Sequence, residues 1–273
     1  MVMGGIYMKE KREKMLSLTD LTMNYGSKTV LNGINLDVYR GQIIGYIGPN
    51  GAGKSTTVKI MLGLIDGYQG KVEIFGQNIV DGDITYKKKI GYVPENAELY
   101  ETLTPREYLT FTGELYGLDR KEAESKALNL LMHFGLEKVF DSRISSFSKG
   151  MKQKVLIISS LLHDPDLLFF DEPLSGLDAN SMMVVKEMIT LLSDAGKTIF
   201  YSSHIMDVVE KISTRIVLLV EGAIVADGSF EELVIDSKEG SLEDIFNQLT
   251  GFSNHRDIAE RLVTTMAGGQ KNG

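Results

Sequence analysis

The chain has 273 residues, no cysteine, 29 basic and 37 acidic side chains, and therefore a net charge of −8 at pH 7. This acidity argues against a dedicated nucleic-acid binder, because such proteins carry a surplus of basic residues. The lack of cysteine excludes disulfides, thiolate metal sites and cysteine nucleophiles, and it is compatible with a cytoplasmic address.

The amino-terminal segment predicts a tail outside the folded domain. Residues 1–14 carry the charged run KEKREK where a secretory signal would have its apolar stretch. We expect a flexible, solvated tail there. The longest apolar run, Ile216 to Ala226, contains Glu221 and is shorter than the about 20 residues that a bilayer requires. The chain is therefore expected to contain no membrane-spanning segment.

Short apolar runs alternate with longer helical patterns in the body of the chain. Leu16–Leu21 and Leu31–Val38 alternate polar and apolar residues, which indicates an antiparallel piece near the N-terminus. Five later runs are apolar nearly throughout, as strands covered on both faces are; they are Gln42–Ile47, Ile90–Val93, Leu167–Asp171, Thr198–Ser202 and Arg215–Val220. The alternation predicts an α/β fold with a mainly parallel sheet and an N-terminal antiparallel β subdomain.

Between Thr104 and Leu162 only helical patterns occur, which predicts an inserted helical subdomain over about 96–162. It opens with Thr104-Pro105-Arg106-Glu107, an N-cap, a proline at the first helical position and a glutamate three residues on. Arg120–Phe134 and Lys149–Leu162 are expected to be further helices, and apolar residues recur at helical spacing after Asp178.

The last part of the chain contains two more capping boxes, Ser229 with Glu232 and Ser241 with Asp244, which predict short helices. We therefore divide the chain into three parts. These are a tail over 1–14, one domain over 15–228 with the helical subdomain inside it at about 96–162, and a C-terminal helical extension over 229–273.

The strongest chemical motif is GPNGAGKST, which fits G-x-x-x-x-G-K-[ST] and lies between the strand Gln42–Ile47 and a helix expected over Ser55–Leu64. Its glycines let backbone N–H groups point at phosphate oxygens, and the helix N-terminus adds positive partial charge. Lys54 should reach the β- and γ-phosphates, and Ser55 should bind Mg²⁺. Phosphate contacts are expected along the loop, from Gly48, Asn50, Gly51, Ala52, Gly53, Lys54, Ser55 and Thr56.

A second motif, LLFFDEP at residues 167–173, places two adjacent carboxylates after an apolar strand. Open parallel sheets bind their ligands at this edge. Together with the phosphate loop, the motif predicts that Asp171 holds Mg²⁺, usually through water. It also predicts that Glu172 orients or deprotonates an attacking water.

Two weaker signals stay ambiguous when they are taken alone. Ser148 precedes a helix start, which fits either a plain N-cap or an anion site that includes Gly150. His204 follows the strand Thr198–Ser202, where a lone histidine is more often a surface residue than a functional one.

The ordered set of motifs, over about Leu16 to Gly228, resembles the nucleotide-binding subunits of ATP-binding cassette (ABC) transporters. The resemblance implies that Tyr25 in MNYGSKTVL stacks on adenine and that His204 contacts the γ-phosphate. It also places SFSKGMKQK at the family signature, so that Ser148 and Gly150 close over ATP bound to a second copy. Ser175-Gly176-Leu177-Asp178 matches the loop that crosses the dimer.

The sequence departs from the family pattern in two places. Glu95 stands where a glutamine usually links Mg²⁺ to the membrane subunit, and its carboxylate is also a hard ligand for Mg²⁺. In the signature, Phe147, Lys149 and Met151 replace the usual leucine, glycine and glutamine. This variant looks like that of exporter subunits whose permease is a separate chain.

The resemblance implies an ATPase subunit with ATP and Mg²⁺ as cofactors. Lys54, Glu172 and His204 would be its catalytic side chains. Its partners would be a separately encoded permease and a second nucleotide-binding subunit, in a homodimer or a heterodimer. It would be cytoplasmic, and peripheral on the inner face of the cell membrane. No nucleic-acid partner is expected.

The sequence leaves two alternative functions to consider. The first is a soluble ABC-type ATPase acting on nucleic acid or ribosomes. It is disfavoured by the acidic balance and by the absence of sustained heptads between the phosphate loop and the signature. The second is a P-loop kinase or GTPase. The GTPase is disfavoured because the sequence contains no Asn-Lys-x-Asp motif for guanine recognition.

Overall fold

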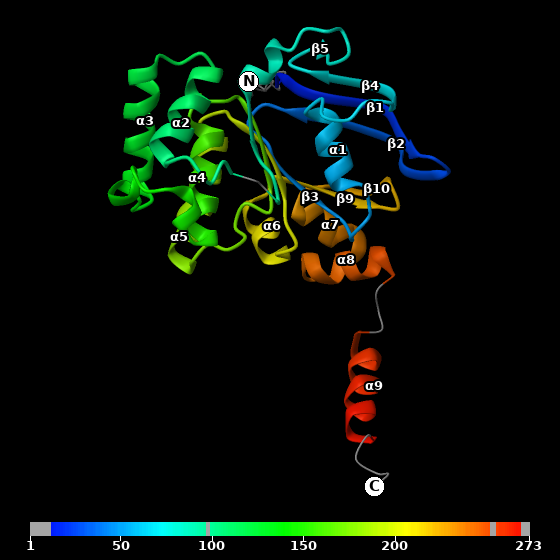
Figure 1. Cartoon of the computed structure of the whole chain (residues 1–273). Coiled ribbons are helices and arrows are strands. Elements are labelled where there is room, and N and C mark those ends of the chain that lie inside the picture. The colour runs from blue at the N-terminus through cyan, green and yellow to red at the C-terminus, as the bar shows by residue number, and fades with distance from the viewer. Residues whose placement is uncertain (1–11, 97–98, 252–254, 269–273) are drawn as a thin grey trace, which may run out of the picture.

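The computed structural model describes residues 12–96, 99–251 and 255–268. Its centre is a six-stranded sheet in the spatial order β10-β9-β3-β8-β7-β6 (Figure 1). The strands are β3 (Ile43–Ile47), β6 (Ile90–Val93), β7 (Leu167–Asp171), β8 (Thr198–Ser202), β9 (Arg215–Val220) and β10 (Ala223–Gly228). Strands β6, β7, β8, β3 and β9 pair in parallel, whereas the edge strand β10 runs antiparallel to β9.

The five apolar runs of the sequence are these five parallel strands, so the predicted mainly parallel sheet is confirmed. Strand β3 begins one residue later than expected. The apolar run Ile216 to Ala226 proved to be part of a hairpin, β9 and β10. The chain reverses at Glu221 and Gly222, whose φ angles are 48° and 79°. A two-residue turn with both φ angles positive matches the twist of paired strands.

A second, antiparallel sheet has the order β2-β1-β4-β5. It consists of β1 (Lys14–Tyr25), β2 (Lys28–Tyr39), β4 (Gln69–Ile74) and β5 (Gln77–Asn78). The expected antiparallel piece is therefore confirmed, but its strands are longer and β4 and β5 come in addition. The expected tail lies largely outside the described residues. Its last residue, Lys14, belongs to β1, and its ammonium lies 2.7 Å from the Asp37 carboxylate.

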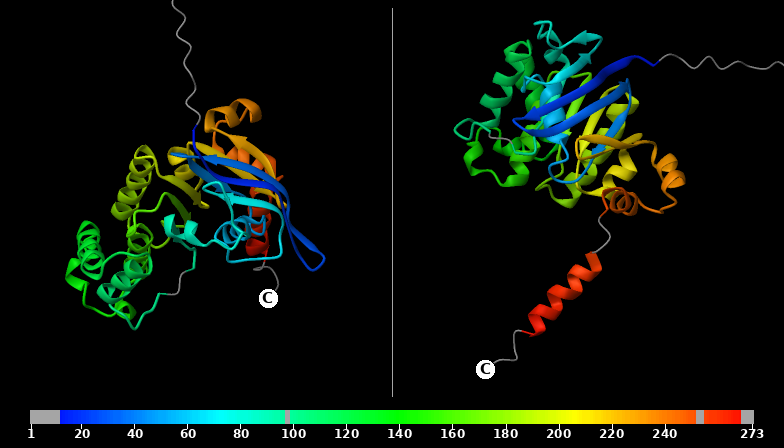
Figure 2. Two further views of the ribbon diagram at one scale, coloured as in Figure 1. Left: turned by 90° about the horizontal axis from the view of Figure 1, so that it is seen from above. Right: turned by 90° about the vertical axis from the view of Figure 1, so that its right-hand side faces the viewer.

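The two sheets face one another with helix α1 (Lys54–Met61) between them (Figures 1 and 2). Apolar residues of both sheets and of α1 form one buried cluster. The helix was predicted to reach Leu64 but ends at Met61. Gly63, with a φ of 62°, carries the chain out of the helix in the left-handed conformation that glycine tolerates best.

The opposite face of the central sheet is covered by helices. They are α5 (Ala179–Asp194), α6 (Met206–Ile212), α7 (Phe230–Ser237) and α8 (Leu242–Thr250). Ser229 and Glu232 form the predicted reciprocal capping box. At Ser241 only the N-cap half of the predicted box is present: the Ser241 hydroxyl accepts the N–H of Asp244 at 3.1 Å, and the Asp244 carboxylate accepts a hydrogen bond from the Ser241 hydroxyl instead of from its N–H. Helix α9 (His255–Gly268) follows and stands apart from the folded body (Figure 1).

The helical insert lies to one side of the central sheet (Figure 1). It contains α2 (Pro105–Leu115), α3 (Arg120–His133) and α4 (Lys149–Leu161), which share a buried apolar cluster of their own. The predicted capping box of Thr104 and Glu107 is present. Short 3₁₀ turns complete the chain, at Thr85–Lys89, Glu137–Val139 and Ile144–Ser146.

Candidate functional site

The loop between β3 and α1 is held close to its neighbours by small residues. A Cβ atom added at Gly53 would lie 2.6 Å from Cδ2 of Leu31 and 2.8 Å from the Val30 carbonyl oxygen, and Gly53 has a φ of 107°. Both facts favour glycine at this position. The loop therefore exposes backbone N–H groups and a helix N-terminus, which together form an anion-binding surface.

Lys54 lies at the start of α1, inside this loop. Its ammonium donates to the carbonyl oxygens of Gly48 at 2.5 Å and Pro49 at 3.2 Å. Burial lowers the pKa of Lys54, whereas the carboxylates of Asp171, Glu172 and Glu95 raise it. The ammonium therefore lies where it can exchange two carbonyl contacts for the oxygens of an anion.

Strands β7 and β8 deliver their side chains to the same sheet edge. Asp171 and Ser202 are direct neighbours in the parallel register, and the Ser202 hydroxyl donates to the Asp171 carboxylate. This hydrogen bond fixes the orientation of Asp171 toward the phosphate loop.

Glu172 follows directly in a left-handed backbone conformation with a φ of 50°, which costs on the order of 1 kcal/mol for a residue other than glycine. Its carboxylate accepts the backbone N–H of His204 at 2.7 Å and the hydroxyl of Ser203 at 3.1 Å. Burial raises the pKa of Glu172, and the hydrogen bonds from Ser203 and His204 lower it. The side chain is thus held by two donors in a partly desolvated position.

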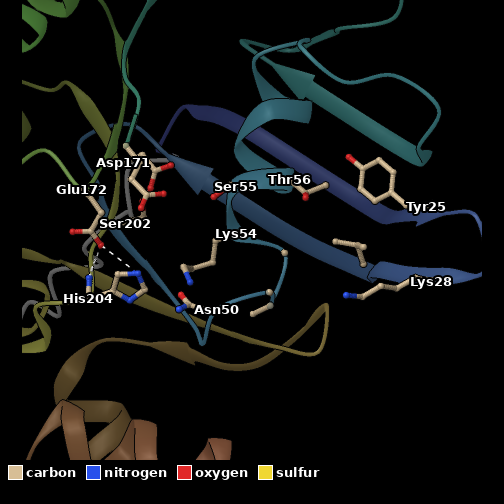
Figure 3. A pocket seen from close by; sticks show the side chains of 15 residues that line it. Tyr25, Lys28, Asn50, Lys54, Ser55, Thr56, Asp171, Glu172, Ser202 and His204 are labelled. Atoms are coloured by element: carbon tan, nitrogen blue, oxygen red, sulfur yellow. Dashed lines mark hydrogen bonds and ion pairs between the residues drawn. The ribbon is translucent and has the colours of Figure 1, made fainter. Parts of the chain in front are cut away.

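His204 is half-exposed, and its Nε2 lies 3.7 Å from Oε1 of Glu172. Figure 3 shows both side chains at one end of a pocket and Tyr25 at the other, with the loop of Lys54 between them. The pocket is lined by Tyr25, Lys28, Val30, Asn50, Gly51, Ala52, Gly53, Lys54, Ser55, Thr56, Glu95, Asp171, Glu172, Ser202 and His204.

Most of the residues expected at the site meet in this one pocket. Gly48 does not line it, but its carbonyl oxygen holds Lys54. Ser148 and Gly150 do not line it either. They lie at the start of α4, where the Ser148 hydroxyl accepts the N–H of Met151 at 3.3 Å. A Cβ atom at Gly150 would lie 2.6 Å from the Gly176 carbonyl oxygen, so this helix start touches the segment 175–178.

Three lining residues were missed from the sequence: Lys28, Val30 and Ser202. Lys28 and Val30 begin β2, directly after the turn that follows Tyr25. The alternation of β2 indicated a strand, but it did not indicate that the start of this strand turns toward the phosphate loop. The sequence predicts Ser202 as the last residue of its strand. It does not predict the contact with Asp171, because that contact depends on the register of two strands far apart in sequence.

This combination of folds and side chains defines a P-loop nucleotide triphosphatase with an inserted helical lobe. The family model described as ABC transporter matches residues 31–175, and the chain belongs to this family. The relatives that this chain matches are ATP-binding subunits of transporters, and this chain is an ATPase subunit of that type. The expectation of an ABC ATPase is therefore confirmed over a nucleic-acid or ribosome-acting ATPase.

Similar proteins point the same way. The linearmycin resistance ATP-binding protein LnrL of Bacillus subtilis is 38% identical over 219 residues, which are 80% of this chain and 70% of LnrL. A solved ATP-binding subunit of an ABC transporter has a TM-score of 0.81 and 36% identity, covering 86% of this chain and 99% of that one. A dimeric post-hydrolysis ATP-binding cassette with ADP and phosphate has a TM-score of 0.72 and 25% identity, covering 79% and 98%.

Among the described helices, none combines the length and the apolar content that a membrane crossing requires.

Proposed function

We propose that this chain powers an exporter, as one of two ATPase subunits bound to a separately encoded permease at the inner face of the cell membrane. One observation carries the proposal. Residues of five separate segments meet in the pocket of Lys54, whereas the helix start at Ser148 lies outside that pocket. Export is supported by LnrL, whose name assigns that protein to resistance, and by the signature variant with Lys149 and Met151.

ATP lies along the pocket in this proposal. Tyr25 is 49% exposed, so its ring is free to stack on adenine. Lys28 lies beside it (Figure 3) and adds a positive charge at that end. The phosphates lie on the loop 48–56, with Lys54 on the β- and γ-phosphates.

The donors for Mg²⁺ are the hydroxyl of Ser55 and the carboxylates of Asp171 and Glu95, which line the same pocket. Such hard oxygens fit Mg²⁺. No group of three or more His, Cys, Asp or Glu side chains with metal-site geometry exists in the described part of the chain. The protein therefore supplies part of the coordination shell, which suits an ion that keeps waters and binds substrate phosphates. When bound, Mg²⁺ neutralises phosphate charge.

Glu172 accepts the proton of the attacking water in the proposed reaction. Its raised pKa makes the carboxylate a stronger base than an exposed glutamate. Lys54 and His204 stabilise the charge that develops on the phosphoryl group. The hydrogen bonds from Ser203 and the His204 backbone hold the base in one orientation.

A second copy completes the site. The chain carries both the pocket and the helix start at Ser148, so two identical copies suffice to build two complete sites. In each site, the N-terminus of α4 from the partner closes over the triphosphate and excludes water. Exclusion of water strengthens every electrostatic contact inside.

The proposal is tested by introducing a negative charge at position 148 with a residue that still caps the helix. Aspartate and asparagine cap helices about as well as serine, so neither variant should lower the melting temperature. Ser148→Asp places a negative charge against the partner's triphosphate. We expect at least about a tenfold loss of ATPase activity and of ATP-dependent dimerisation, since like charges in an interface cost several kcal/mol.

Ser148→Asn is the matched control and should retain most of the activity. ADP binding to either variant, measured by calorimetry, should equal that of the wild type, because Ser148 does not line the pocket of its own chain. Equal ATPase activity of Ser148→Asp and Ser148→Asn would contradict the composite site.

Ser203 is a positioning residue for Glu172, and its removal should change the pH dependence of hydrolysis. The Ser203 hydroxyl favours the charged carboxylate, so Ser203→Ala raises the pKa of Glu172 further. A base works only when it is deprotonated, and the acid limb of the kcat profile should therefore move to higher pH. We expect kcat at the optimum to fall about tenfold or less.

Ser203→Thr keeps the hydroxyl and should restore the wild-type pH profile. A Ser203→Ala enzyme whose acid limb coincides with that of the wild type would mean that Ser203 supports only the loop, where its oxygen also accepts the N–H of Ile205 at 3.2 Å.

A further inference from the structure

Helix α9 exposes an apolar face that no other described part of the chain covers. Every described side chain over residues 257–266 is exposed. The large apolar ones are exposed by 46% to 80%; they are Ile258, Leu262, Val263 and Met266. Figure 1 and the right-hand view of Figure 2 show the helix standing away from the rest of the molecule.

The apolar residues share one side of the helix. At 3.6 residues per turn, Ile258, Leu262 and Met266 follow one another along the axis, and Val263 flanks them. Thr264 and Asp257 lie on the opposite side. A helix of 14 residues is marginal in water on its own, so this helix needs a surface that covers its apolar side.

The charges of α9 favour a protein surface over a lipid surface. Two arginines and two acidic residues balance one another over residues 255–268, whereas helices that lie on anionic membranes carry a polar face rich in lysine and arginine. The apolar side contains no charge, so two copies of it can meet without bringing like charges together.

The attachment of α9 places it near the dimer interface of the proposed function. Helix α8 lines a groove together with residues 48–50 of the phosphate loop, His204 and Met206. Gly251 and His255 are four residues apart, a span of about 14 Å at most for an extended chain. The helix α9 therefore starts close to the face on which the ATP site is completed by the second copy.

We propose that α9 packs against α9 of a second copy of this chain, as an extension of the ATP-dependent dimer. The inference rests on the dimer of the proposed function. The midpoint of α9 lies between Arg261 and Leu262. In a parallel pair, the two-fold axis runs along the helices and each Leu262 faces its own copy. In an antiparallel pair whose two-fold axis crosses the helices at their midpoints, the two Leu262 side chains again lie close together. Four apolar side chains make a small interface, so α9 does not form a dimer alone. The ATP-bridged dimer holds the two α9 helices at a high effective concentration, and their pairing then stabilises that dimer further.

The cysteine-free sequence gives a direct test by cross-linking. Leu262→Cys and the matched control Thr264→Cys are placed in the full-length Glu172→Gln protein, incubated with Mg-ATP and exposed to a mild oxidant. We expect Leu262→Cys to form a disulfide-linked dimer at least about tenfold faster than Thr264→Cys, because a disulfide needs Cα atoms within about 4.4–6.8 Å.

A second measurement uses Leu262→Asp against Thr264→Asp. The protein concentration for half-maximal ATP-dependent dimerisation should rise about tenfold for Leu262→Asp and stay unchanged for Thr264→Asp. Gel filtration separates the two hypotheses. If ATP induces a dimer but Leu262→Cys links no faster than Thr264→Cys, α9 pairing is wrong. If ATP induces no dimer in any variant, the proposed dimer itself is wrong.

Discussion

Lys54→Ala is expected to lower kcat/KM for ATP hydrolysis by about 10²–10³-fold, the loss typical of removing one aligned donor to a developing negative charge. The pocket contains three carboxylates, from Glu95, Asp171 and Glu172, and all three raise the pKa of Lys54. Lys28 is the other lysine that lines the pocket. It lies on β2 beside Tyr25, at the far end from Glu172 (Figure 3).

The loss should therefore appear in nucleotide binding as well as in turnover. Without the Lys54 ammonium, the triphosphate meets a surface whose nearest side-chain charges are negative. We expect weaker binding of ATP and of ADP in calorimetry, and a steady-state ATPase assay gives the loss of turnover. The loss of ADP binding should be smaller, since ADP lacks the γ-phosphate.

Lys59→Ala is the matched control for this experiment. Lys59 lies on the same helix α1, is exposed, and does not line the pocket. It removes the same charge from the same element, so its kinetics should stay close to those of the wild type. Normal turnover by Lys54→Ala would contradict the assignment of the phosphate loop.

The parallel core was predictable because both of its faces are buried. A strand covered on both sides reads as a continuous apolar run, and β6, β7, β8 and β9 were placed with their observed bounds. Strand β4 and the short β5 carry little of this signal. Four of the six residues of β4 are exposed or partly exposed, and its register depends on pairing with β1, far earlier in the chain.

At the site, the contiguous motifs were predictable from the sequence, whereas the contacts between strands were not. The phosphate loop and the Asp171–Glu172 pair are contiguous motifs, and each motif indicates its chemistry from its residues alone. Ser203 and Ser202 act through strands β7 and β8, which lie side by side although they are about thirty residues apart. Such contacts depend on register, and a single sequence gives no register for parallel strands.

The left-handed backbone of Glu172 could not be predicted from the sequence either. Its φ of 50° is adopted by a side chain that does not favour it. The conformation turns the chain after β7, so that the Glu172 carboxylate meets the N–H of His204 while Asp171 faces the phosphate loop. Two adjacent acids thereby point to different parts of one pocket. This geometry gives them different tasks in the proposed reaction.

Glu172→Gln should consequently separate ATP binding from hydrolysis. The amide has the shape of the acid but is no base, and loss of a general base typically costs 10²–10⁴-fold in rate. Its oxygen still accepts the His204 N–H. Because burial already disfavours the charged carboxylate, a neutral group in this position fits at least as well, and it removes one negative charge near the γ-phosphate. We expect ATP affinity to be kept or increased.

The variant should accumulate as a dimer, since ATP that is bound but not hydrolysed keeps the two copies bridged. Gel filtration with Mg-ATP should show a dimer for Glu172→Gln, whereas the wild type should return to monomer as ATP is consumed. Glu187→Gln removes the same charge from an exposed position on α5 and should behave as the wild type. Rapid turnover by Glu172→Gln would assign the base elsewhere. A monomer at saturating ATP would remove the partner's Ser148 helix from the site.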